Sequence, residues 1–146
     1  MVNAVSEKYT ASELMDRACY RIAWNIHHMW SETGTSDTRL FMEPIIPESF
    51  VTVGKSRKGA DRKEHVVPRR VLCEECHKMF GEKASIDEVA IVIKKYLKIV
   101  LISKAEQEHL DYELGLKQSM PPGWSFKNGN PFHRLEFANI EYDLFA

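Results

Sequence analysis

The stretch that decides the fold class begins at Ser85 and reads SIDEVAIVIKKYLKIVLISKAE, ending at Glu106. Ser85 and Glu88 form a capping box, and the apolar residues that follow recur at helical spacing. Residues 98–102 are a β-rich apolar run, which predicts a buried strand. Ser103 and Glu106 then open another capped helix. A helix, a strand and a second helix therefore follow one another directly.

Towards the N-terminus, the sequence predicts one longer helix. Thr10 and Glu13 form a capping box at its start, and the polar cluster around Gly34 ends it. Between them, apolar residues recur three and four positions apart and form a single stripe: Met15, Ala18, Cys19, Ile22, Ile26, Met29 and Trp30.

The middle of the chain predicts two short strands and a helix. Residues 50–53 (FVTV) and 64–67 (EHVV) are the strands, and a basic loop containing Gly54 and Gly59 joins them. Pro68 suits the first turn of a helix that Gly81 ends. The apolar face of this helix is Val71, Leu72, Cys76, Met79 and Phe80.

The C-terminal part predicts a capped helix closed by Gly115 and a short final helix over residues 132–138, opened by Asn130 and Pro131. The whole order is an N-terminal helix, a ββα unit, αβα elements and a short C-terminal helix. We therefore expect an α+β fold in one compact domain over residues 1–146, without an internal repeat or a dividing linker.

Composition agrees with one domain. The chain has 146 residues, of which 44% are hydrophobic and 28% charged. No run approaches the roughly 18 apolar residues of a membrane helix, so no membrane partner is expected. The N-terminus lacks the apolar core of a signal peptide, and three cysteines are too few for a disulfide framework. These features favour a cytoplasmic protein.

The charge is concentrated in one segment. Residues 55–70 hold seven basic and two acidic residues, whereas the rest of the chain holds 13 basic and 19 acidic residues. Such a basic segment is typical of a surface that binds phosphate or an acidic partner. A solvated loop is the alternative. The basic residues are Lys55, Arg57, Lys58, Arg62, Lys63, Arg69 and Arg70.

Beside this segment lie residues suited to phosphodiester hydrolysis. Glu64 precedes His65 at the end of a predicted strand, and His77 follows on the next helix. A carboxylate can hold a divalent metal, and a neutral imidazole can take a proton from water. No Walker loop, dinucleotide-binding glycine pattern or serine-nucleophile elbow is present. Asp111 and Glu113 lie two residues apart on a predicted helix and do not form a carboxylate pair.

Two motifs here, EHVVP (64–68) and LCEECH (72–77), resemble the HNH endonucleases, which have the ββα-metal fold. The resemblance implies a metal-dependent nuclease or a nucleic-acid-binding domain derived from one. It implies His65 as the general base, with Glu64 and His77 as ligands of Mg²⁺ or Mn²⁺. Cys73 is a conditional further metal ligand, which the resemblance does not itself imply. The basic residues would then hold backbone phosphates.

Two other interpretations remain open. The chain is alternatively a non-catalytic inhibitor or adaptor, of the kind that phages and other mobile elements encode. Its basic segment would then bind nucleic acid or an acidic protein surface. Separately, Cys73, Cys76 and His77 are candidate zinc ligands, although a closed structural site needs four. Cys73 and His77 share a helix face, whereas Cys76 falls on the apolar stripe.

Overall fold

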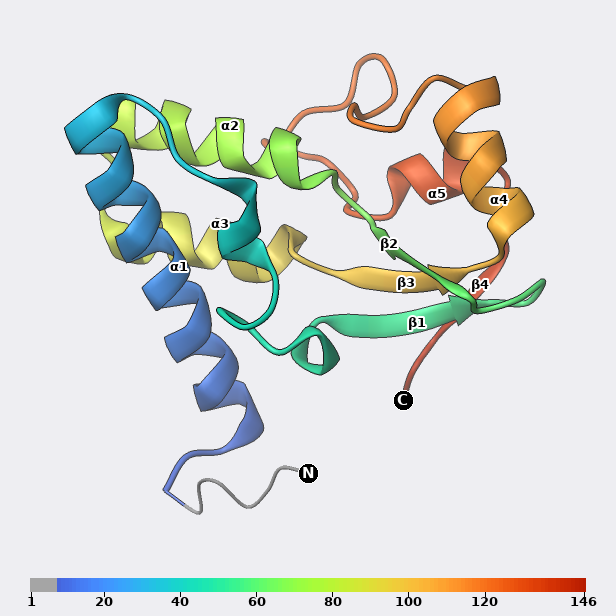
Figure 1. Cartoon of the computed structure of the whole chain (residues 1–146), viewed down its shortest axis with the longest axis horizontal. Helices are drawn as coiled ribbons and strands as arrows, with labels where there is room; N and C mark the ends of the chain where they lie inside the picture. The colour runs from blue at the N-terminus through green and yellow to red at the C-terminus, as the bar shows by residue number, and fades with distance from the viewer. Residues whose placement is uncertain (1–7) are drawn as a thin grey trace.

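The computed structural model describes residues 8–146 and has an α+β architecture (Figure 1). Helix α1, Ala11–Thr33, begins at the predicted capping box: Thr10 Oγ1 accepts from the Glu13 N–H at 3.1 Å, and Glu13 Oε1 accepts from the Thr10 N–H at 2.8 Å. It ends at Gly34, whose φ of 79° is the left-handed conformation that glycine tolerates best. The helix buries Ala18, Cys19, Ile22, Ala23 and Ile26.

Four strands form one mixed sheet in the order β2-β3-β1-β4. They are β1 (Thr52–Ser56), β2 (Arg62–His65), β3 (Ile99–Ile102) and β4 (Tyr142–Leu144). The pair β1 and β3 is parallel, and the other two pairs are antiparallel. Although β1, β2 and α2 follow one another as expected, β1 and β2 are not neighbours, because β3 lies between them.

The first two strands lie a few residues away from their predicted positions. A 3₁₀ turn, Glu48–Phe50, precedes β1, and the Thr52 hydroxyl donates to the Glu48 carbonyl at 2.8 Å, so the strand begins only at Thr52. Pairing with β3 fixes β2 over Arg62–His65. The loop expected between the two strands is therefore shorter than predicted. Its first residues, 54–56, belong to β1, and Arg62 and Lys63 belong to β2.

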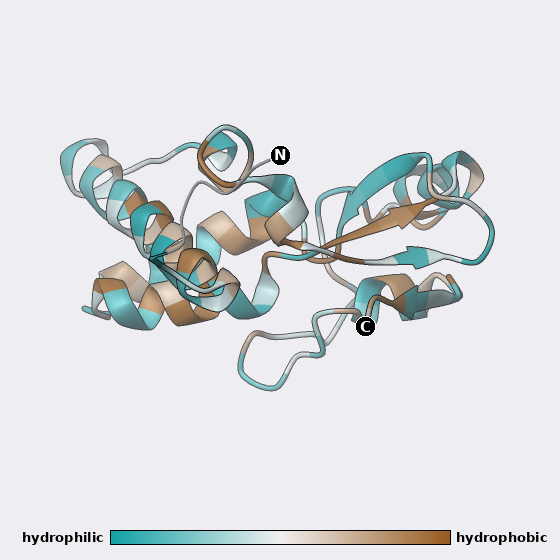
Figure 2. Ribbon diagram, turned by 90° about the horizontal axis from the view of Figure 1, so that it is seen from below, coloured by the Kyte–Doolittle hydropathy of each residue, from teal (hydrophilic) through white to brown (hydrophobic). Residues whose placement is uncertain are grey.

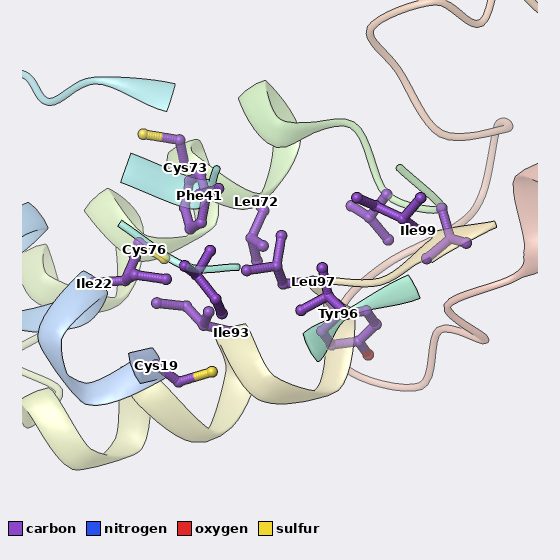
Figure 3. Close-up of a cluster of buried hydrophobic side chains, with 14 of the residues drawn as sticks. Cys19, Ile22, Phe41, Leu72, Cys73, Cys76, Ile93, Tyr96, Leu97 and Ile99 are labelled. Carbon is purple, nitrogen blue, oxygen red and sulfur yellow. The ribbon is translucent and has the colours of Figure 1, made fainter. Parts of the chain in front are cut away.

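Helices α2 (Arg69–Gly81) and α3 (Ile86–Tyr96) pack with α1 on one side of the molecule (Figure 1). The capping box of Ser85 and Glu88 is present at the start of α3. A 3₁₀ turn, Thr38–Phe41, adds Phe41 to the core. Figure 3 shows this core, which includes Cys19, Ile22, Phe41, Leu72, Cys76, Ile93, Tyr96 and Leu97.

At the other side of the molecule, α4 (Lys104–Glu108) opens at the capping box of Ser103 and Glu106 and continues as a π-helical turn, His109–Glu113. Helix α5, His133–Phe137, confirms the predicted final helix, and β4 follows it as an unpredicted edge strand. Strand β3 consists of four apolar residues and is hydrophobic along its length (Figure 2). Three of these residues are accordingly buried. None of the helices within residues 8–146 has the length and apolar character needed to cross a membrane.

Candidate functional site

A polar cleft of about 260 Å³ opens where β2 meets the start of α2. Three consecutive residues of β2 line it, Lys63, Glu64 and His65, so the predicted catalytic pair reaches this cleft. The other lining residues come from the start of α2 and from segments distant in sequence: Thr38, Pro68, Arg69, Arg70, Gln107, Asp111, Lys117 and Gln118.

The cleft is rich in positive charge. Lys63, Arg69, Arg70 and Lys117 all line it. Lys63 pairs with Glu48 at 2.7 Å and Arg70 with Glu74 at 3.4 Å, but all four partners are at least partly solvated. Such exposed pairs contribute little and exchange readily for a ligand.

The start of α2 adds further donors to the cleft. Its N-cap residue is Pro68, and no side chain caps the helix. The first backbone N–H groups of a helix have no partner inside it, and the helix dipole concentrates positive potential there. Because Pro68, Arg69 and Arg70 all line the cleft, these amides and two guanidinium groups gather at one edge.

Glu64 has a structural partner. Its Oε2 accepts from Nη2 of Arg134 at 2.5 Å, and Arg134 is fully buried. The same guanidinium donates to the carbonyls of His65 at 2.6 Å and Leu116 at 3.0 Å. Burial raises the pKa of the Glu64 carboxyl, and the charge of Arg134 partly offsets this. The carboxylate predicted as a metal ligand thus holds α5 against β2.

His65 is held as a neutral imidazole. Burial, followed by the positive charge of Arg69, lowers the pKa of His65 to about 4. Its Nε2 is buried and has no hydrogen-bond partner among residues 8–146. The imidazole is neutral, as the predicted general base requires, but a pKa of about 4 makes it a weak base. The ring lies in the wall of the cleft, and its Nε2 does not face solvent.

His77 and Cys73 lie further along α2 and do not line the cleft. Ser36 Oγ lies 2.5 Å from His77 Nε2 and 3.2 Å from Cys73 Sγ, and the two α2 side chains are 3.7 Å apart. Burial raises the pKa of the Cys73 thiol and lowers the pKa of His77. Glu64 is not part of this cluster, because its carboxylate pairs with Arg134. The predicted metal ligands Glu64 and His77 therefore do not meet.

The predicted zinc ligands do not form a complete set. Figure 3 shows Cys76 inside the core beside Ile22, whereas the sulfur of Cys73 points away from it. Cys76 is fully buried, which raises the pKa of its thiol. Over the described part of the chain, no three His, Cys, Asp or Glu side chains gather to hold a metal ion. Neither Glu64 with His77 and Cys73 nor the Cys73, Cys76 and His77 set fits one.

The remaining basic residues divide into paired and unpaired groups. Arg57 pairs with Asp143 at 3.0 Å and Glu141 at 3.9 Å, and Arg62 with Asp61 at 3.6 Å. C-terminal acids thus neutralise part of the basic segment. The side chains without an ion pair to any residue in 8–146 are Lys55, Lys58 and Arg69, and only the last lines the cleft.

Sequence reasoning missed Arg134 and the lining residues from the second half of the chain. A signal for Arg134 was present: it lies four residues before Ala138, on the same helix face, and both are buried. A charge on an apolar face calls for a buried partner. Lys117 and Gln107 carry no comparable signal, because only the tertiary fold brings them to β2. Comparisons with protein-family models, curated proteins and solved structures give no match.

Proposed function

We propose that this protein binds nucleic acid, and that the cleft between β2 and α2 holds a backbone phosphate. The observation that carries the proposal is the convergence of four basic side chains with an uncapped helix start. Guanidinium groups and helical N–H groups both match phosphate oxygens, by charge and by hydrogen-bond geometry. Thr38, Gln107 and Gln118 add neutral polar groups for a sugar or a base edge.

Nucleic acid fits the cleft better than an acidic protein surface does. A hollow of about 260 Å³ has room for a phosphate and its sugar, whereas a folded protein surface would reach it only through a protruding side chain. Two of the cations, Arg69 and Arg70, belong to the helix start, and both side chains carry the guanidinium group that suits phosphate oxygens. A non-catalytic adaptor or inhibitor that binds nucleic acid is consistent with this arrangement.

The test is a binding titration with fluorescently labelled DNA and RNA oligonucleotides, single-stranded and duplex. Arg69→Glu and Lys117→Glu should each weaken binding by about tenfold or more, because each removes a charged contact and adds repulsion. Lys127→Glu is the matched control, because this exposed lysine lies outside the cleft. Equal losses in all three variants, or no binding by the wild type, would refute the proposal. Binding to an acidic protein alone would favour the other class of partner.

Hydrolysis of the bound strand is the second candidate function. Its support is the position of His65, which lines the same cleft as Asp111 and the cations. A neutral imidazole can take a proton from water. The HNH resemblance implies a site for Mg²⁺ or Mn²⁺. Among residues 8–146, however, no three His, Cys, Asp or Glu side chains lie together to bind such an ion. The test is to incubate labelled strands with Mg²⁺ or Mn²⁺ and either the wild-type protein or His65→Ala. Cleavage by the wild type that is lost in the variant would support hydrolysis, and strands left intact by the wild type would exclude it.

A further inference from the structure

The outer face of α1 and α3 groups large apolar side chains that stay exposed. Tyr20 and Trp24 of α1 are 41% and 45% exposed, and Ile91 of α3 is 69% exposed. Isolated apolar residues on a surface are ordinary, but a group of them marks a contact surface. Tyrosine and tryptophan are also the residues most enriched where protein interfaces gain their binding energy.

These three side chains line two neighbouring hollows. One, of about 270 Å³, lies between α1 and α3 and is lined by Tyr20 and Ile91. The other, of about 340 Å³, is lined by Tyr20 and Trp24. Since Tyr20 belongs to both, the hollows form one surface, the α1/α3 face, composed of Tyr20, Arg21, Trp24, Asp87 and Ile91.

The charges on this face are of both signs. Asp16 and Lys94, at the edge of the first hollow, neutralise each other at 2.6 Å. Arg21 lines the second hollow and Asp87 the first, and neither forms an ion pair within residues 8–146. The apolar centre is thus flanked by one free positive and one free negative charge.

A face with this pattern is complementary to itself. In a two-fold symmetric contact the same patch is used twice, so every contact between unlike residues occurs in duplicate. The free charges of Arg21 and Asp87 balance on this face, whereas four cations line the phosphate cleft, so this face attracts nucleic acid less than the cleft does. A purely acidic protein partner would meet Asp87 unfavourably.

We propose that the α1/α3 face binds a second copy of this chain in a symmetric dimer. Tyr20, Trp24 and Ile91 pack against the equivalent side chains, and Arg21 pairs with Asp87 of the partner subunit. This inference goes beyond nucleic acid binding and does not depend on it, because it concerns a different surface and different residues.

The test measures the mass of the wild-type protein by light scattering over a range of concentrations, without oligonucleotide. The expected result is a dimer that dissociates on dilution. Trp24→Ala should raise its Kd by about tenfold or more. Met29→Ala is the matched control: Met29 is an exposed α1 residue, 38% accessible, outside both hollows, and its loss should leave the Kd unchanged.

Charge reversal tests the pairing itself. Arg21→Glu and Asp87→Arg should each weaken the dimer, and the double variant should restore it, because the charges are exchanged and not removed. Circular dichroism establishes that each variant keeps its fold. A monomer at every concentration, a dimer indifferent to Trp24→Ala, or a double variant no better than the single ones would overturn the proposal.

Discussion

Arg134 and Glu64 form a buried ion pair, with Nη2 and Oε2 2.5 Å apart, that joins α5 to β2. Because Arg134 is fully buried, either partner alone would leave a charge inside the protein without compensation. The pair also fixes the backbone at His65, whose carbonyl accepts from the same guanidinium. This contact therefore sets the shape of the cleft wall.

We predict that Arg134→Ala and Glu64→Ala each destabilise the protein by about 3–5 kcal/mol. The double variant Glu64→Ala with Arg134→Ala should lose less than the sum of the single losses, since it leaves neither charge without its partner. Urea unfolding of the four proteins measures this coupling. Additive losses would show that the two side chains act independently.

His65 should make the stability depend on pH. Its pKa falls from about 6.5 in the unfolded chain to about 4 in the folded protein, so the unfolded state binds more protons between these values. Stability from this group is present above about pH 6.5 and is lost as the pH falls towards 4. Between pH 7 and pH 5 the wild type should lose up to about 2 kcal/mol more than His65→Gln does. Parallel unfolding profiles would contradict the buried, neutral state of His65.

Gly54 should be required for the pairing of β1 with β4. A Cβ at this position would lie 2.6 Å from the carbonyl oxygen of Asp143 and 3.2 Å from Cα of Leu144, both backbone atoms. Gly54→Ala should therefore cost about 1–3 kcal/mol and loosen β4. Hydrogen exchange of the Phe145 amide, which donates to Val53 at 2.8 Å, would then accelerate.

Gly81→Ala is the control for this substitution. Its Cβ would meet only Trp30, at 3.9 Å, which is an ordinary contact. Placed at the end of α2, alanine should leave stability unchanged or slightly higher. Equal effects at both positions would mean that crowding against β4 is not the cause.

Local signals account for the parts of the fold that the sequence predicted well. The three capping boxes, at Thr10, Ser85 and Ser103, all form as expected, because each depends on residues within one helical turn. The order of the strands depends on distant partners. Nothing near residues 52–65 indicates that β3 separates β1 from β2, and β4 has only three residues, two of them exposed.

The candidate site likewise has a part that the sequence predicted and a part that depends on the tertiary fold. Lys63, Glu64 and His65 were predicted together and lie together in the cleft, since they are consecutive on one strand. His77 was joined to them because its chemistry suits a metal ligand and because of the family resemblance, but it contacts Ser36 and Cys73 instead. Lys117 reaches the cleft through the tertiary fold alone.

Backbone NMR of the protein titrated with a short single-stranded oligonucleotide tests the central claim most directly, because it locates the bound phosphate. We predict the largest amide shifts at residues 69–71, where α2 begins without a side-chain cap, and at residues 117–118. These shifts should fade as salt is raised. The absence of shifts, or shifts confined to surfaces away from the cleft, would contradict the proposal that this cleft binds nucleic acid.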